Sequence, residues 1–331
     1  MARTSGTLGP KRVITATAAS GIYGLSEIHK ERIAGNWVVG GVAGYFGGGW
    51  DGGNLSGIDK ITFPADTKTT LSENLGSARY AVAGMANAGV AGYFGGGFDT
   101  GRISQIVKIA FPADTKTNLS ATLSTARTGG AAMANSGVAG YFGGGRDSAV
   151  LSGIDKIAFP ADTKTTLAAT LATARDTNTG MANAGIAGYF SGGTDYTGYI
   201  ASIDKIAFSN DARTTLSAGL TTARDTPAGM ANAGVAGYVG GGRSPTYRDG
   251  IDKIAFPADT KTTLSAVLAT VNAYLAALSS ESVAGYFGGG FDGSTNKSII
   301  EKIAFPNDSK TSLSATLTTA RREFGAMSNS L

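Results

Sequence analysis

The stretch Gly140-Tyr141-Phe142-Gly143-Gly144-Gly145 is one of six copies of a single pattern, Gly-Tyr-(Phe/Val)-(Gly/Ser)-Gly-Gly, in a chain of 331 residues. The tyrosines of the six copies follow one another at 48 residues, with one step of 49, and they are Tyr45, Tyr93, Tyr141, Tyr189, Tyr238 and Tyr286. A period of this length marks supersecondary units that stack in a row or close into a ring. Shared positions then build the scaffold, so a binding surface is sought where the copies differ.

The third copy predicts four short strands in each repeat. Asn135-Ser136-Gly137 is a tight-turn signal between two apolar runs, and 160–164 (Pro-Ala-Asp-Thr-Lys) is a second turn. The predicted strands, in chain order A to D, are 131–135, 138–143, 154–159 and 165–171. Four antiparallel strands repeated six times indicate an all-β fold, a six-bladed β-propeller. A right-handed β-solenoid is the competing architecture, but its coils are usually shorter.

The same residues resemble the kelch family of propellers. The glycine doublet after Tyr141-Phe142, the aromatic Phe159, Leu167 and the downstream Arg175 stand in kelch order, and this register recurs through residues 41–331. Leu167 stands where kelch repeats usually carry tryptophan, so the likeness is to a divergent branch. The resemblance implies a six-bladed kelch-like propeller over 41–331 and implies almost nothing about function.

The two ends of the chain raise the question of how the ring closes. Residues 322–329 repeat the start of strand A without a strand B after them, which predicts that they complete the first blade. Residues 36–40 occupy the same register and are the alternative. The preceding segment, 1–40, lies outside the repeat as an N-terminal arm, and Ser26 in it could cap a short helix over 25–34.

Part of the arm resembles a known class of proteins. Residues 21–27 and 34–37 are similar to a short segment of structural proteins of tailed bacteriophages, especially marine ones. This resemblance implies a virion protein that is made in the host cytoplasm, anchored to other virion proteins through 1–40 and present in several copies on the particle. The alternative for 1–40 is an ordinary arm that packs on the propeller.

Composition excludes several kinds of partner and chemistry. The net charge is +4 and the basic residues are scattered, so we expect no nucleic-acid partner. No signal peptide and no apolar run long enough to cross a bilayer is seen, so we expect no membrane insertion. Cysteine is absent and His29 is the one histidine, which argues against a catalytic triad, a metal site or a cofactor.

Repeated carboxylates are predicted to be structural. An aspartate follows most glycine triplets and is expected to accept backbone hydrogen bonds within its turn; these are Asp51, Asp99, Asp147, Asp195 and Asp292, with Ser244 replacing it in the fifth copy. The pairs Asp155-Lys156, Asp204-Lys205 and Asp252-Lys253 are interpreted as charges that keep sheet edges soluble. The arginines before strand A are expected to tie down the D–A connections, and they are Arg79, Arg127, Arg175, Arg224 and Arg321.

Variation among the copies is concentrated in the loop between strands B and C. Because strands alternate in direction, the six B–C loops share one face of the propeller with the D–A connections, and we call this the variable face. Its aromatic and arginine side chains form the candidate binding face: Trp50, Phe98, Arg102, Arg146, Tyr196, Tyr199, Arg243, Tyr247, Arg248 and Phe291. Such side chains suit saccharide or protein contacts. Drift in tolerant loops is the alternative explanation.

Together these observations predict a non-enzymatic structural component of a phage virion. It would be a tail-fibre, tail-tip or head-decoration protein whose variable face binds a host glycan or protein. The alternatives are a glycan-cleaving propeller enzyme and a cytoplasmic kelch-type scaffold for protein interactions.

Overall fold

The computed structural model describes residues 13–15, 18–20, 42–280, 282–305 and 307–329. The chain divides into two compact units, Met1–Gly41 and Val42–Leu331. The described part of the first unit is an antiparallel pair, β1 (Val13–Thr15) and β2 (Ala18–Ser20). The helix predicted over 25–34 and the segment 36–40 lie outside the described residues. No helix among the described residues could span a membrane.

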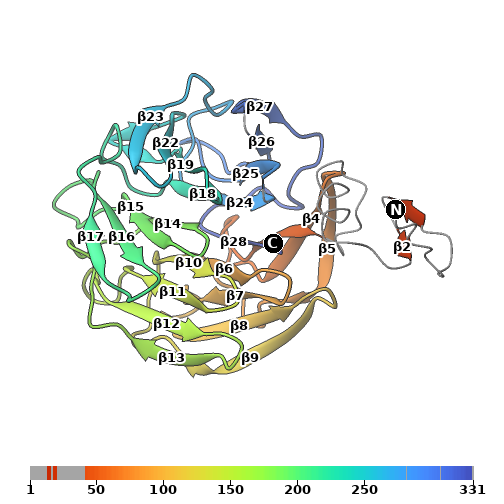
Figure 1. Ribbon diagram of the computed structural model, residues 1–331, viewed down its shortest axis with the longest axis horizontal. Helices are drawn as coiled ribbons and strands as arrows, with labels where there is room; N and C mark the ends of the chain where they lie inside the picture. The colour runs from red at the N-terminus through yellow and green to blue at the C-terminus, as the bar shows by residue number, and fades with distance from the viewer. Residues whose placement is uncertain (1–12, 16–17, 21–41, 281, 306, 330–331) are drawn as a thin grey trace, which may run out of the picture. The chain divides into compact units, whose positions relative to one another are not determined.

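The second unit is an all-β propeller of six four-stranded antiparallel sheets, its blades, arranged around a central axis (Figure 1). Blade 1, from its inner to its outer strand, consists of β28 (Gly325–Ser328), β3 (Ala43–Gly47), β4 (Gly57–Thr62) and β5 (Thr67–Asn74). Blade 2 consists of β6 (Ala83–Asn87), β7 (Ala91–Gly95), β8 (Gln105–Ala110) and β9 (Thr115–Thr122). Blade 3 consists of β10 (Ala131–Asn135), β11 (Ala139–Gly143), β12 (Ile154–Ala158) and β13 (Thr163–Thr166). Blade 4 consists of β14 (Thr179–Asn183), β15 (Ala187–Ser191), β16 (Ile203–Ala207) and β17 (Arg213–Thr215). Blade 5 consists of β18 (Ala228–Asn232), β19 (Ala236–Gly240), β22 (Ile251–Ala255) and β23 (Thr260–Thr263). Blade 6 consists of β24 (Ala276–Ser280), β25 (Ala284–Gly288), β26 (Ile300–Ala304) and β27 (Ser309–Ser312).

The first three strands predicted from the third copy agree closely with the structure of that blade, and the fourth does not. In blade 3, β10 has the predicted bounds, whereas β13 lies at Thr163–Thr166 instead of 165–171. The outer strand pairs directly after the turn, with Thr163 opposite Ala158, and the chain then leaves the sheet. Leu171 consequently packs in the core, where it is 2% exposed.

The core consists of layers between neighbouring blades. In one of them, Tyr141 and Ile154 of blade 3 pack with Phe190, Ile206 and Phe208 of blade 4. The tyrosine of strand B and the residue after it fill this space together with the apolar residues of strand C, because the neighbouring blade covers strand B and all five residues of each of these strands are buried.

The same set of side-chain contacts joins each blade to the next. The hydroxyl of Tyr141 donates to Asp211 Oδ1 at 2.8 Å, Lys156 Nζ lies 2.6 Å from Asp211 Oδ2, and the Tyr141 ring stacks on Phe208. All six boundaries carry the same Tyr and Lys pair on a turn aspartate, and these aspartates are Asp114, Asp162, Asp211, Asp259, Asp308 and, between blades 6 and 1, Asp66. The lysines therefore connect blades.

The strand-C aspartates are a second correction to the sequence analysis. Asp155, Asp204 and Asp252 are at most 1% exposed, so they are not edge charges. Each accepts a hydrogen bond from the arginine that ends the preceding repeat; for Asp155 this is Arg127 Nη2, at 2.8 Å. Strand C is covered by the neighbouring blade, so a charge on it needs a buried partner.

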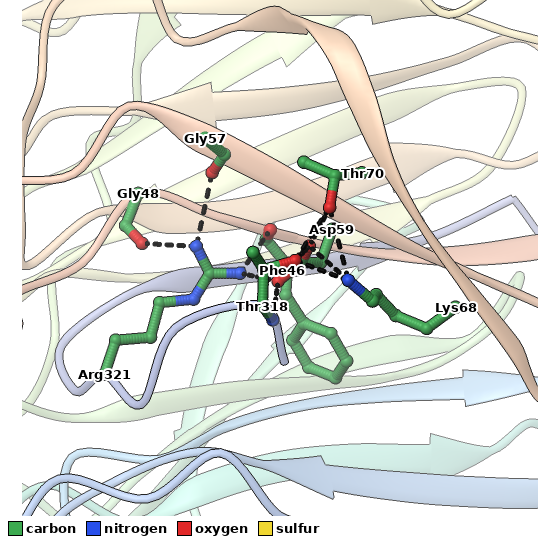
Figure 2. Close-up of polar contacts among 8 residues, drawn as sticks. All are labelled: Phe46, Gly48, Gly57, Asp59, Lys68, Thr70, Thr318 and Arg321. Carbon is green, nitrogen blue, oxygen red and sulfur yellow. Dashed lines mark hydrogen bonds and ion pairs between the residues drawn. The ribbon is translucent and has the colours of Figure 1, made fainter. Parts of the chain in front are cut away.

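The ring closes through the last described strand. β28 pairs antiparallel with β3, so the segment beside β3 is Gly325–Ser328. Figure 2 shows how the preceding loop is held: Arg321 donates to the carbonyl oxygens of Gly48 and Gly57 and, at 2.8 Å, to Asp59. Thr318 also donates to Asp59, from its backbone nitrogen and its hydroxyl. Residues from both ends of the propeller sequence therefore build blade 1.

Candidate functional site

Each loop of the variable face is anchored to the D–A connection beside it. In blade 4, Asp176 and Thr194 exchange two backbone hydrogen bonds, of 2.9 and 3.0 Å, and corresponding bridges occur in all six blades. Turn aspartates shape the loops as predicted; Asp195 accepts from the nitrogens of Thr197 and Gly198, both at 2.8 Å. Side chains on this face are therefore presented from a defined backbone.

A closed ring of backbone hydrogen bonds surrounds the axis on this face. Just before each inner strand, a single residue donates its backbone N–H to the carbonyl oxygen of the equivalent residue in the preceding blade. The N···O distances are 2.6–3.2 Å. The six residues, which we call the axial ring, are Ala81, Gly129, Thr177, Thr226, Tyr274 and Glu323. All have φ between 53° and 63°, the left-handed region, which is rare for a β-branched residue such as Thr177 or Thr226. Such strain often accompanies functional sites.

A cavity of about 430 Å³ opens beside this ring, over blades 4 to 6. We call it the inter-blade pocket, and it is lined by Thr177, Thr194, Tyr196, Thr197, Gly198, Tyr199, Asp225, Arg243 and Tyr274. Its size lies in the usual range for small-ligand sites. The lining combines three phenol rings with hydroxyl groups, a carboxylate and a guanidinium, so it can stack on a flat face and form several hydrogen bonds.

The carboxylate of the pocket's charged pair is buried, whereas the arginine side chain is partly exposed. Arg243 Nη2 donates to Asp225 Oδ2 at 2.8 Å, and Asp225 is 3% exposed. Burial raises the pKa of Asp225 above its ordinary value, although the bond from Arg243 opposes this shift. Burial also raises the pKa of Tyr274 to about 12, so this phenol stays protonated at neutral pH. A ligand here meets one fixed ion pair and neutral hydroxyl groups.

One edge of the pocket is formed by an exposed tyrosine. Tyr196 is 59% exposed and has φ of 67°, which is unusual for a bulky residue. Its hydroxyl donates to Asp176 Oδ2 at 2.5 Å and accepts from Arg146 Nη1 at 3.0 Å, while the guanidinium lies 4.8 Å from the ring centre. Burial raises the pKa of Asp176 above its ordinary value. These contacts hold Tyr196 between blades 3 and 4.

The structure divides the ten predicted face residues into three groups. Tyr196, Tyr199 and Arg243 line the pocket, and Arg146 contacts Tyr196. On blades 5 and 6, the rings of Tyr247 and Phe291 lie 5.8 Å apart, and Arg248 donates to the Ser244 carbonyl oxygen. On blades 1 and 2 are Trp50, Phe98 and Arg102.

The ten residues differ in their exposure to solvent. Arg102 and Tyr196 are exposed, whereas the other eight are half-buried, because neighbouring side chains pack against them. The guanidinium of Arg322, for example, lies 4.5 Å from the Phe291 ring centre. On the opposite face, three threonines at the start of outer strands are exposed, namely Thr67, Thr115 and Thr163, and they can serve as controls for the variable face.

The sequence analysis missed the contribution of the D–A connections. Tyr80, Asp176, Asp225, Tyr274 and Glu323 all follow the anchoring arginine, or Asn272 in its place, by one or two positions. The copies differ at these two positions as they do in the B–C loops, and that variation was the available signal. In the described residues, no three His, Cys, Asp or Glu side chains are arranged to hold a metal ion.

Comparison with known proteins supports the fold and nothing finer. No protein-family model and no curated protein matches the chain. Among solved structures, the one described as "Structure of YjhT" is similar, with a TM-score of 0.62 and 14% identity over 75% of this chain and 87% of that one. At this identity the similarity concerns the propeller fold alone.

Proposed function

We propose that this protein is a non-enzymatic binding module that takes a neutral saccharide unit in the inter-blade pocket. The observation that carries the proposal is the lining of that cavity, where Tyr199 and Tyr274 stand with the Asp225–Arg243 pair. A sugar ring offers an apolar C–H face for an aromatic ring and hydroxyl groups for hydrogen bonds. A flat protein epitope would make little use of a cavity of about 430 Å³.

The carboxylates of the site argue for binding without hydrolysis. Glycoside hydrolysis needs two carboxyl groups whose environments separate their pKa values, one acid and one ionised partner. Asp176 and Asp225 are both buried. Both also have hydrogen-bond partners within the protein, Tyr196 and Arg243. We therefore prefer a lectin-like role to the glycan-cleaving alternative.

The setting we propose is a phage particle, with the saccharide belonging to the host surface. This part rests on the resemblance of residues 21–27 and 34–37 to structural proteins of tailed phages. Mass spectrometry of purified particles tests it, and absence of the chain from particles would favour the cytoplasmic scaffold.

The binding proposal is tested by screening the full chain on printed bacterial glycans, followed by calorimetry with the glycan that binds. Tyr199→Ala should weaken affinity about 30-fold, since truncating a central aromatic costs about 2 kcal/mol. Thr163→Ala, on the opposite face, is the matched control and should bind like the parent. If no glycan binds, or if the Thr163 variant loses binding and the Tyr199 variant keeps it, the proposal fails.

Two further readouts separate the alternatives. Release of reducing sugar from the bound glycan would identify a glycan-cleaving enzyme. Binding of host cells that survives enzymatic removal of surface glycans would point to a protein receptor.

A further inference from the structure

A second group of aromatic side chains lies on the variable face, outside the inter-blade pocket. Trp50 belongs to the loop of blade 1, Phe98 to the loop of blade 2, and Tyr80 to the connection between these blades. The ring centres of Trp50 and Tyr80 are 5.6 Å apart, and those of Tyr80 and Phe98 are 5.5 Å apart. All three side chains are half-buried, so each keeps part of its surface in contact with solvent. We call them the aromatic row.

The aromatic row has a fixed backbone. Tyr80 and Phe98 exchange two backbone hydrogen bonds, of 3.1 and 2.9 Å. The side-chain amide of Asn54, in the loop of blade 1, donates to the carbonyl oxygen of Asp99 at 2.9 Å and so joins the two loops. Rings that are held before binding lose little conformational entropy when a ligand stacks on them.

The row and the pocket lie on opposite sides of the axis. In a closed ring of six blades, blades 1 and 2 face blades 4 and 5 (Figure 1). The axial ring runs between the two sites: Thr177 and Thr226 lie on the pocket side, and Ala81, which follows Tyr80, lies on the side of the row. Of the two axial-ring neighbours of Ala81, Gly129 has no side chain, whereas Glu323 lies at blade 1.

The groups around this path are those that bind sugar hydroxyls. Of the other axial-ring side chains, Tyr274 and Glu323 are half-buried and polar. Thr226 is buried and donates its hydroxyl to the carbonyl oxygen of Asp225, and the hydroxyl oxygen of Thr177 is buried as well. Beside the row is Arg102, which is exposed. The variable face thus has two aromatic platforms with polar groups between them. A single sugar ring can use one platform, and a chain of sugar units can reach both.

We infer that the aromatic row is a second subsite for the same glycan, and that the ligand is an oligosaccharide that crosses the axis from the inter-blade pocket to Trp50, Tyr80 and Phe98. The inference rests on the proposed saccharide function of the pocket. It adds that the ligand has several units and that chain length determines affinity.

The test measures affinity against chain length by calorimetry on the full chain. The probes are cello- and chito-oligosaccharides of one to six units, together with size-fractionated oligomers of any glycan found on the array. For the parent protein, affinity should rise about tenfold or more between the monosaccharide and the longest oligomer, because a second stacking contact is gained. Trp50→Ala should remove most of this gain and leave monosaccharide affinity unchanged. Phe98→Ala is the second variant, and monosaccharide binding reports that each variant is folded.

The outcomes distinguish the two proposals. A chain-length gain that is absent, or that persists in both Trp50→Ala and Phe98→Ala, overturns the second subsite while the pocket function stands. Weaker binding of monosaccharide and oligomer alike in Tyr199→Ala, with the gain lost only in the row variants, supports both. If the parent binds no probe of any length, the pocket function fails and the subsite fails with it.

Discussion

The guanidinium of Arg127 and the carboxylate of Asp155 are both buried, and they meet at 2.8 Å. Burial lowers the pKa of Arg127, and the nearby Asp155 opposes this shift. Arg127 also donates to the carbonyl oxygens of Gly144 and Gly153, so the pair connects the end of one repeat to the next blade. Each partner is tolerated in the core because the other is present.

Asp155→Ala should therefore destabilise the propeller by about 3–5 kcal/mol, because it leaves Arg127 buried without a counter-charge. Urea unfolding followed by circular dichroism measures the loss. Asp147→Ala removes an aspartate that accepts one backbone hydrogen bond in the surface loop of the same blade, and it should cost only about 1 kcal/mol. Equal effects of the two substitutions would contradict a structural role for the buried pair.

The pH dependence of stability should show the buried acids of the variable face. Burial raises the pKa of Glu323, a shift that Arg322 opposes and Asp176 reinforces. The folded state then holds this proton more tightly than the unfolded state, so its contribution to stability falls as pH rises from the ordinary glutamate pKa through the raised value.

Glu323→Gln should consequently be more stable relative to the parent at pH 7 than at pH 4. Urea midpoints of both proteins at the two pH values check this. A difference that is the same at both, or larger at pH 4, would show that Glu323 does not titrate above its ordinary range in the folded protein.

At the scale of the element, the inner strands are limited by how closely their backbones approach. A Cβ atom on Gly180 would lie 2.3 Å from the carbonyl oxygen of Ala132 in the neighbouring inner strand. That oxygen belongs to the backbone and cannot rotate away. The close contacts between neighbouring inner strands therefore require a residue without a side chain at this position of the strand.

Gly180→Ala should cost about 1–3 kcal/mol, the usual penalty for overpacking a core. Gly153→Ala is the matched control, because a Cβ atom there would meet nothing within 4 Å. Thermal unfolding of the two variants compares them. If Gly180→Ala is as stable as the control, the inner strands can separate more easily than the structure indicates.

The strands of blade 3 differ in how accurately the sequence predicts their positions. The hairpin of β10 and β11 was predictable because Asn135-Ser136-Gly137 marks a turn between two apolar runs. The outer strand β13 was placed two residues too late, since Leu167 and Leu171 extend the β-like pattern although the chain has left the sheet. Burial of Asp155 was not predictable from blade 3 alone, because Arg127 comes from the preceding repeat.

Over the whole molecule, the boundary between blades 6 and 1 uses the same contacts as the others. Tyr286 and Lys302 meet Asp66 at 2.7 Å each, as Tyr93 and Lys108 meet Asp162. The closing boundary joins residues far apart in sequence, yet its geometry is that of a boundary between consecutive repeats.

Asp66→Asn and Asp162→Asn should therefore destabilise the propeller by similar amounts, about 1–3 kcal/mol each, because each weakens a hydrogen bond to a charged group. Urea unfolding of the two variants tests this equivalence. A much larger loss for Asp66→Asn would mean that the ring opens first at its closing boundary.

The candidate site was less predictable than the fold because it depends on residues that occur in only one copy of the repeat. Repetition revealed the six blades because every copy reports the same scaffold. The inter-blade pocket instead depends on single departures from the repeat, such as Asp225 and Tyr274, that come from different copies. Only the packing of blades 4 to 6 side by side brings those departures together, so the B–C loops could be recognised as variable while their partners on the D–A connections were overlooked.

The axial ring has an electrostatic consequence. Its six peptide hydrogen bonds all point the same way around the axis, from each blade to the one before it. Their dipoles lie along the circumference and sum to nearly nothing over a full turn, unlike the aligned dipoles of a helix. The backbone therefore contributes almost no net field at the centre of this face. The potential that an arriving ligand meets there is therefore set by charged side chains such as Glu323, Arg322 and Arg243.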